Sequence, residues 1–296
     1  MNIIETNSLK AWILAIRPKT LTAASIPVMI GCALAYVYGY FQFTPALLCF
    51  LFAFLMQIDA NFINDLYDFL KGTDREDRLG PERACAQGWI TTKAMKVGII
   101  LTTLASGIVG LSLLYYGGIE MIPVGIACIL FALLYTAGPY PLAYHGWGDA
   151  LVLIFFGIVP VGCTFYVMAH EWNTAVTLAS IACGLVIDTL LMVNNFRDRE
   201  QDTLSGKRTL VVRLGARAGL ILYFLLGMVA CWCCVYFIMI GKIYAALLPQ
   251  IYLIPHILTT QRMAKINRGK QLNSILGETS RNMLLFGMLL TLGLVL

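Results

Sequence analysis

The chain has 296 residues and a formal net charge of +5; 59% of its residues are hydrophobic and only 12% are charged. Soluble domains carry roughly 25% charged residues, so this composition excludes an ordinary water-soluble protein. The basic residues lie in short segments between apolar stretches, and they therefore do not indicate a nucleic-acid-binding surface.

Apolar stretches of about 20 residues recur along the chain and predict an all-α, polytopic membrane protein, with a single transmembrane domain over residues 1–296. Residues 8–19 form a short amphipathic segment before the first stretch. That stretch has no Ala-x-Ala-like cleavage site, so a cleaved signal peptide is not expected. About nine transmembrane helices are predicted, at residues 21–41, 45–69, 94–116, 119–136, 149–169, 173–195, 216–240, 243–261 and 279–296.

The lysines and arginines are distributed on one side of this topology. If the predicted helices alternate in direction, 20 of the 21 basic residues fall on one face, and Lys242 is the exception. Because basic residues accumulate in cytoplasmic loops, this pattern places the N-terminus and these loops in the cytoplasm, as expected for a multi-pass protein of the cell (inner) membrane. The nine cysteines lie mostly within apolar stretches and are predicted to be small buried side chains without disulfides.

A first group of polar residues lies at the end of the second predicted helix. Asn61, Asn64, Asp65 and Asp68 are spaced i, i+3, i+4 and i+7, so on a helix they form one polar stripe. Carboxylate and amide oxygens are the hard ligands that Mg²⁺ prefers, and Mg²⁺ bound in this way often also contacts substrate phosphates. The stripe therefore predicts a divalent-metal site.

A second group begins at the end of the sixth predicted helix and continues into the segment after it. Asn195, Asp198 and Asp202 share one helical face. Four predicted helices separate the two groups, so an alternating topology brings both to the same side of the membrane. This indicates a weak duplication, in which a polar-ended helix and a charged loop occur twice, and predicts one shared metal-and-anion site.

The alternative interpretation is that these are ordinary polar residues at a membrane boundary. Carboxylates at membrane depth are costly and usually functional, and their occurrence twice on one side favours a site. Asp59 and Asp188 lie deeper within the predicted helices. Three roles remain open for each: an added metal ligand, a contact between helices, or a protonated carboxyl.

The charge balance predicts an anionic ligand. Clustered carboxylates repel one another, and metal ions that neutralise them would attract a strongly anionic group such as a diphosphate. Because the site lies at the membrane boundary, the rest of the ligand is expected to be a lipid chain. Basic residues next to both groups offer charge-assisted contacts, although each also has the plainer role of setting topology: Lys71, Arg78, Arg83, Arg197, Lys207 and Arg208.

These motifs, in this order, resemble the UbiA superfamily of intramembrane aromatic prenyltransferases. Asn64-Asp65-x-x-Asp68 is similar to its first Asp-rich motif, and Asp198-x-x-x-Asp202 is similar to its second. The resemblance is closest to the 1,4-dihydroxy-2-naphthoate polyprenyltransferase branch of menaquinone biosynthesis. It is carried by Arg17-Pro18-Lys19-Thr20-Leu21, Gly72 and Asp74, Asp77-Arg78-Leu79-Gly80-Pro81-Glu82-Arg83, Tyr140 to Gly146, Gly148-Asp149, Asn194 to Asp198, Gly206-Lys207-Arg208-Thr209-Leu210 and Leu272-Asn273.

The resemblance implies a UbiA-like helical bundle with both Asp-rich motifs on the cytoplasmic face. It implies a Mg²⁺-dependent transfer of a polyprenyl group from polyprenyl diphosphate to 1,4-dihydroxy-2-naphthoate, with loss of diphosphate and CO₂, giving a demethylmenaquinone. Asp65, Asp68, Asp198 and Asp202 would be the catalytic metal ligands, together with Asn64. The expected diphosphate-binding residues are Asn61, Lys71, Asp74, Arg78, Arg83, Asn195, Arg197, Lys207 and Arg208.

Further residues are expected to bind the acceptor or to stabilise an allylic cation through an aromatic face. They are Lys19, Tyr67, Tyr140, Tyr144, His145 and Asp149, with Tyr135 and Phe196 as further aromatic candidates. Each aromatic residue also has the alternative role of packing or of an interfacial belt, Asp149 that of a helix cap, and His145 that of a loop residue.

Two other functions compete with this interpretation. The same chemistry on 4-hydroxybenzoate, homogentisate, or a haem or chlorophyll precursor is less consistent with the Gly-Lys-Arg-Thr-Leu and Gly-Pro-x-Arg segments. A cation-coupled transporter would also use internal repeats and intramembrane acids, but it usually places its site near the membrane midplane. The motifs carry no information on the length of the prenyl chain or on the oligomeric state.

Overall fold

The computed structural model describes residues 4–73 and 78–296, and the side chain of Lys19 lies outside that description. Within these residues the chain is helical throughout its regular structure. The helices are α1 (Leu9–Ile16), α2 (Pro18–Val37), α3 (Phe43–Leu70), α4 (Thr92–Gly117), α5 (Met121–Thr136), η1 (Leu142–His145), α6 (Gly148–Val152), η2 (Leu153–Ile158), α7 (Val159–Ala169), α8 (Thr174–Leu204), α9 (Leu210–Leu214), α10 (Ala216–Val235), η3 (Tyr236–Ile240), α11 (Ile243–Leu247), η4 (Leu248–Tyr252), α12 (Leu253–Ile266) and α13 (Leu272–Val295).

Local sequence sets several of these bounds. Arg17 adopts a left-handed conformation with φ of 55°, which ends α1, and Pro18 occupies the first position of α2, where its missing N–H costs no helical hydrogen bond. The side chain of Thr91 accepts a hydrogen bond from the Ala94 N–H at the start of α4. Asn173 caps α8 in the same way.

The expectation of about nine membrane-crossing helices holds approximately. Seven helical segments among the described residues are long and apolar enough to cross a membrane. They are Thr20–Val37, Phe43–Leu70, Thr92–Gly117, Gly148–Ala169, Thr174–Leu204, Ala216–Ile240 and Ile243–Ile266. The other two predicted helices correspond to α5, which has 16 residues, and to α13, whose first turns are polar.

The sixth predicted helix is longer than expected. The prediction ends it at residue 195, whereas α8 continues to Leu204 before the Ser205-Gly206 turn. Arg, Glu and Gln are good helix formers, and no proline or glycine interrupts the segment from Asn195 to Leu204, so the helix extends beyond its apolar part. Asp198 and Asp202 therefore lie on a rigid helix and not in a loop.

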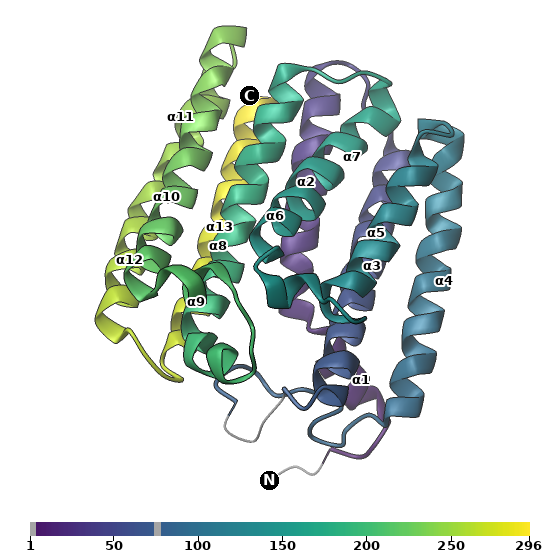
Figure 1. Cartoon of the computed structure of the whole chain (residues 1–296). Helices are drawn as coiled ribbons and strands as arrows, with labels where there is room; N and C mark the ends of the chain where they lie inside the picture. Colours follow the sequence, from purple (N-terminus) through teal and green to yellow (C-terminus); the bar gives the residue numbers. More distant parts are fainter. Residues whose placement is uncertain (1–3, 74–77) are drawn as a thin grey trace.

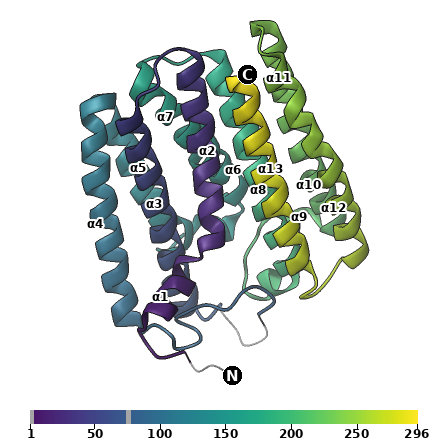
Figure 2. The ribbon, with the colours of Figure 1, turned by 180° about the vertical axis from the view of Figure 1, so that it is seen from behind.

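α3, α8 and α12 end on the same side of the bundle, where α1 also lies (bottom of Figure 1). The connections α2–α3, α4–α5 and α7–α8 lie on the opposite side, together with the C-terminus and Lys242, which precedes α11. Seen from behind, α2 and α13 run next to each other across the middle of the bundle (Figure 2). Both acidic groups are therefore at one end of the helices.

α8 lies in the middle of the bundle and contacts α2, α7, α10 and α13. One crossing on α8 is especially close. A Cβ added at Gly157, in η2, would lie 2.5 Å from the Ser180 carbonyl oxygen and 2.8 Å from the Gly184 Cα. Small residues allow membrane helices to approach in this way, so Gly157 and Gly184 determine how near η2 lies to α8.

We expect Gly157→Ala to lower the thermal unfolding temperature in detergent, because a methyl group there meets backbone atoms that cannot rotate away. Overpacking of this kind costs about 1–3 kcal/mol. Gly125→Ala is the matched control, since an added Cβ at that membrane-helix glycine has no neighbour within 4 Å. Unfolding followed by intrinsic tryptophan fluorescence provides the measurement. Equal unfolding temperatures for the two variants would show that the η2–α8 crossing is not tight.

Candidate functional site

Asp68, in the last turn of α3, is the central carboxylate of the first acidic group. Its side chain is 6% exposed and accepts hydrogen bonds from Arg83 Nη2 at 3.2 Å and from the Tyr144 hydroxyl at 3.0 Å. The Arg83 contact is an ion pair in which both side chains are buried. The burial of two charges requires such partners, so Arg83 and Tyr144 fix the orientation of Asp68.

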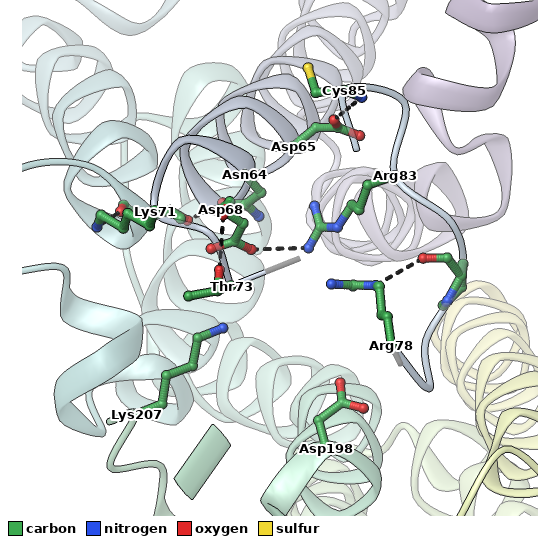
Figure 3. Close-up of polar contacts among 12 residues, drawn as sticks. Asn64, Asp65, Asp68, Lys71, Thr73, Arg78, Arg83, Cys85, Asp198 and Lys207 are labelled. Carbon is green, nitrogen blue, oxygen red and sulfur yellow. Dashed lines mark hydrogen bonds and ion pairs between the residues drawn. The ribbon is translucent and has the colours of Figure 1, made fainter. Parts of the chain in front are cut away.

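Asp65 faces a different neighbour. Its two carboxylate oxygens accept hydrogen bonds from the backbone N–H groups of Ala84 (2.9 Å) and Cys85 (2.8 Å), and Arg17 Nη2 lies 3.6 Å from Oδ2. Figure 3 shows Asp65 directed at the Cys85 backbone and away from Asp68. The polar stripe predicts Asp65 as a metal ligand, and in this structure its carboxylate holds the loop after α3.

The second acidic group continues along α8. Arg197 donates two hydrogen bonds to Asp198, both at 2.7 Å, and the Arg197 side chain is almost completely buried. Asp202 is 8% exposed, and its Oδ1 lies 3.8 Å from Lys207 Nζ. Each carboxylate of this group is thus compensated by a cation close to it in the sequence.

Lys207 and Tyr144 connect the two groups. The Lys207 ammonium lies over the Tyr144 ring, 4.6 Å from its centroid, and the Tyr144 hydroxyl donates to Asp68. The charges of Asp68 and Asp202 act on each other, and that of Lys207 acts on both. In Figure 3, Asp68, Lys207 and Asp198 surround one space, as the duplicated pattern predicts for its two acidic segments.

Lys71 follows α3 and closes one side of this space. Its ammonium donates to the carbonyl oxygen of Thr136 and lies 4.8 Å from the centroid of the Tyr144 ring. Desolvation lowers the pKa of Lys71, an effect that the charge of Asp68 opposes and that of Lys207 reinforces. The Thr136 hydroxyl in turn donates to Asn64 Oδ1, so the end of α5 supports both residues.

The segment from Tyr140 to Asp149 contributes one residue to the site, and the others lie around it. Tyr144 reaches Asp68, whereas Tyr140 stacks on His145 with ring centroids 3.5 Å apart, and His145 Nδ1 contacts the Pro141 carbonyl. Arg208 has an exposed side chain, and its backbone N–H donates to the Tyr144 carbonyl. Asp149 lies in the first turn of α6, and its Oδ1 is buried without a hydrogen-bond partner among the residues that the structure describes.

Other residues that the sequence predicts for the site make, where the structure describes them, no hydrogen bond or ion pair with the carboxylates of the two acidic groups. Asn61 donates to the Ile16 carbonyl and to the Thr20 hydroxyl, both at 2.9 Å, and so joins α3 to the α1–α2 junction. Tyr67 packs against the cluster formed by α1 and the residues after Arg83. Asn195 is half-buried on α8. Asp74 lies outside the described residues.

The two deeper acids also differ in their surroundings. Asp59 is fully buried and accepts hydrogen bonds from the hydroxyls of Thr102 and Thr103 on α4, so it forms a contact between helices. Asp188 is buried next to Asp149, and its Oδ1 has no hydrogen-bond partner in the described part of the chain. Neither lines the cavity described next.

A cavity of about 640 Å³ lies in the bundle between α2, α3, α4, α5, α7 and α8, and it is lined by Asn64 and Asn194, which are four residues before Asp68 and Asp198. Its walls are mainly aliphatic and aromatic, and its far end is lined by Leu113, Met121 and Val167. Its polar end is lined by Arg17, Asn61, Asn64, Tyr135 and Asn194. A long apolar chain with a polar head fits such a shape.

Arg17 and Asn194 are cavity residues to which the sequence patterns assign no site role. Arg17 is the one basic residue among the cavity-lining residues that the structure describes. Asn194 is next to Asn195, which was expected in the site, and a shift of one position turns a helical residue by about 100°. Of the aromatic candidates, Tyr135 lines the cavity, whereas Phe196 is fully buried in the packing of α8.

The donor set fits a divalent cation in its chemistry. Asn64, Asp68, Asp198 and Asp202 offer the carboxylate and amide oxygens that Mg²⁺ prefers. In the described part of the chain, no three acidic, histidine or cysteine side chains converge closely enough to hold a metal by themselves. Mg²⁺ commonly completes its coordination with water and substrate phosphates, so one or two of these carboxylates per ion suffice.

Residues 24–289 match the UbiA prenyltransferase family. The 1,4-dihydroxy-2-naphthoate octaprenyltransferase of Haemophilus influenzae is 36% identical over 300 aligned positions, which cover 97% of this chain and 96% of that protein. The enzyme of the same name from Escherichia coli is 40% identical over 70% of this chain and 69% of its own length.

Solved structures show the same fold. A UbiA homologue from Archaeoglobus fulgidus, bound to GPP and Mg²⁺, has a TM-score of 0.68 at 16% identity, covering 95% of this chain and 99% of that one. A UbiA homologue from Aeropyrum pernix has a TM-score of 0.69, covering 93% and 96% of the two chains.

We expect Mg²⁺ with inorganic pyrophosphate to raise the thermal unfolding temperature of the wild-type protein, and Asp68→Asn or Asp202→Asn to remove most of that increase. A ligand at 100 times its Kd stabilises by about 2.7 kcal/mol. Asp59→Asn is the control, because Asp59 is an equally buried acid that contacts hydroxyl groups away from the site. A wild-type-like increase in both Asp68→Asn and Asp202→Asn would place the ligand elsewhere.

Proposed function

The chain belongs to the UbiA prenyltransferase family, and from this premise we propose that it transfers a polyprenyl group from polyprenyl diphosphate to 1,4-dihydroxy-2-naphthoate. Diphosphate and CO₂ are released, and the product is a demethylmenaquinone in its hydroquinone form, because both ring hydroxyls are retained. The two relatives described above, which are named for this activity, align with 97% and 70% of the chain.

One observation supports this proposal most directly. The buried carboxylates Asp68 and Asp202 converge with Arg83 and Lys207 next to a long apolar cavity, whose polar end is lined by Asn64, four residues before Asp68 on α3. A diphosphate head needs cations and a polyprenyl chain needs an apolar channel, and the arrangement provides both within one site. A transporter substrate would not require the combination of clustered acids, adjacent bases and a channel for a lipid chain.

Asn64, Asp68, Asp198 and Asp202 would hold Mg²⁺, which when bound would neutralise the carboxylates and stabilise negative charge on the leaving diphosphate. Asp65 supports this set by anchoring the loop that carries Arg83. Lys207, Arg83 and Lys71 face the same space, so their N–H groups would donate to phosphate oxygens as the allylic C–O bond breaks and its electron pair moves to the diphosphate.

The acceptor would occupy the polar end of the cavity. Its carboxylate would pair with Arg17, since Arg17 is the basic residue that lines this region among those the structure describes. The face of Tyr135 would lie next to the allylic carbon as positive charge develops there. The ring carbon that bears the carboxylate then forms the new C–C bond, and loss of CO₂ returns an electron pair to the ring.

This assignment moves the acceptor site inward from the residues that the motifs indicate. Tyr140 and His145 contact each other outside the cavity, and Tyr67 packs against the cluster formed by α1 and the residues after Arg83. Tyr144 belongs to the diphosphate side because it binds Asp68 and lies under Lys207.

The orientation in the membrane is part of the proposal. Among residues 4–73 and 78–296, every lysine and arginine except Lys242 belongs to a segment at the end of the bundle that carries the acidic site. Because such residues remain on the cytoplasmic side, the N-terminus and the diphosphate site would face the cytoplasm of a cell with the protein in its inner membrane, where water-soluble acceptors are available.

Purified protein in detergent or proteoliposomes is expected to convert 1,4-dihydroxy-2-naphthoate and a polyprenyl diphosphate to a prenylated product with stoichiometric release of diphosphate and CO₂. A chelator should abolish turnover and Mg²⁺ should restore it. Asp68→Asn and Asp202→Asn should each lower kcat at least about tenfold, because they remove stabilisation of the leaving group. Turnover of 4-hydroxybenzoate or homogentisate, with none of the naphthoate, would contradict the assigned acceptor.

Arg17→Ala is expected to raise KM for the naphthoate acceptor by about 10- to 100-fold, the range expected from loss of one charge-assisted hydrogen-bonded pair, and to change KM for the prenyl donor by less than about threefold. Arg17→Lys should recover part of the loss, since lysine keeps the charge but not the two-pronged geometry. The measurement is steady-state kinetics with each substrate varied separately. An unchanged acceptor KM in Arg17→Ala would remove Arg17 from the acceptor site.

A further inference from the structure

The loop that follows α3 is attached to the bundle at several points. Near Asp65 it is held by the N–H groups of Ala84 and Cys85, and near Asp68 it is held by Arg83. Its other attachment lies at Leu79 and Gly80, close to the second acidic group. The described part of this loop therefore spans both halves of the site.

Asn273, in the first turn of α13, makes this second attachment. Its side-chain Nδ2 donates to the Leu79 carbonyl at 2.8 Å, and its Oδ1 accepts from Arg197 Nη1 at 2.9 Å. A side-chain amide can donate and accept at once, and here it joins a loop carbonyl to a buried guanidinium. Two other nitrogens of the same guanidinium, Nε and Nη2, donate to the carboxylate of Asp198.

Gly80 contributes a second contact to the same guanidinium. A Cβ at Gly80 would lie 2.7 Å from Arg197 Nη2, the nitrogen that binds Asp198 Oδ2. The Arg197 side chain is 2% exposed and is held by Asp198 and Asn273, so it has little space in which to move aside. The absence of a side chain at Gly80 is what allows the loop to lie against Arg197.

We propose that Asn273 is a positioning residue, which holds the loop bearing Arg78 and Arg83 against Arg197 and thereby aligns the two halves of the diphosphate site. The inference rests on the proposed function and extends it to a residue on the last helix. Asn273 touches neither carboxylate of the Asp68–Asp202 pair. It acts through Leu79, whose loop supplies Arg83 to Asp68, and through Arg197, whose guanidinium orients Asp198.

A loosened loop would lower the fraction of molecules in which the site is assembled, and the apparent affinity for the donor would fall by that fraction. The effect should therefore appear in KM for polyprenyl diphosphate more than in kcat. Asn273→Ala is expected to raise this KM by about tenfold and to lower kcat by less than about threefold.

Two further variants separate positioning from general stability. Asn273→Asp keeps an oxygen that accepts from Arg197 but cannot donate to the Leu79 carbonyl, so we expect a thermal unfolding temperature close to the wild type together with the raised donor KM. Gly80→Ala disturbs the same junction from the loop side and should also raise donor KM. Because both variants act on one contact, the double variant Gly80→Ala/Asn273→Ala should show less than the sum of the two effects.

Ser274→Ala is the matched control. Ser274 is next to Asn273, is exposed, and donates to the Gln271 carbonyl at 2.8 Å within the same turn of α13. The Ser274→Ala variant loses this one hydrogen bond, which involves neither the loop nor Arg197. Its KM for the prenyl donor should therefore remain within about twofold of the wild-type value.

Limited trypsin digestion of the protein without substrates gives a readout that is independent of activity. Arg83 is 8% exposed, so cleavage after it requires the loop to open. Cleavage after Arg78 and Arg83, located by fragment mass, should be at least about fivefold faster in Asn273→Ala and Asn273→Asp than in the wild type and in Ser274→Ala.

Two results would overturn the inference. One is a donor KM within twofold of the wild type in Asn273→Ala, Asn273→Asp and Gly80→Ala; the other is unchanged loop cleavage in both Asn273 variants. Neither result bears on the proposed function, which fails separately if the wild-type protein transfers no prenyl group to any aromatic acid. A fall in kcat alone, with donor KM unchanged, would also contradict a positioning role and would indicate direct participation in the chemistry.

Discussion

Compensation of buried carboxylates is the constraint on which the rest of the site depends. Asp68, Asp198 and Asp202 lie at the ends of two long helices in a largely apolar protein. Asp68 and Asp202 are buried and Asp198 is half-buried, and a buried charge without a partner is very costly, so each of these acids needs a cation. The cations are Arg83 from the loop after α3, Arg197 from the end of α8, and Lys207 from the segment that follows α8. The need to pair each acid with its cation fixes where these segments lie.

The same charges support the proposal that the site holds a diphosphate. Bases that neutralise carboxylates are already directed at one space, and they can turn to phosphate oxygens without leaving it. Lys207 and Tyr144 matter here because they are shared between the two acidic groups. Under the proposed function, positive charge is thus arranged before the donor binds, and stabilisation of the leaving group would need little reorganisation at the moment of reaction.

Identical residue types serve different purposes in this protein, depending on their neighbours. Asp65 anchors a loop through two backbone N–H groups, Asp59 connects α3 to α4 through two threonines, and Asp68 faces the site. Asn61 and Asn64 both line the cavity, and Asn61 in addition connects α3 to the α1–α2 junction. Acids and amides on one stripe of α3 therefore divide between holding the fold and forming the site.

The sequence by itself determined the membrane character, the approximate positions of the helices and the segments that carry the chemistry, because these follow from hydropathy, helical period and charge. It also predicted that Asp68 and Asp202 would lie at the same end of the bundle. Only the tertiary structure decided that Asp65 turns to the loop, that Arg17 and Asn194 line the cavity, and that Asn273 reaches Leu79. A helical stripe spans about 100° of the helix surface, so residues at its two edges face different elements. Contacts between segments nearly 200 residues apart, such as that between Asn273 and Leu79, depend on tertiary packing, which no local sequence pattern encodes.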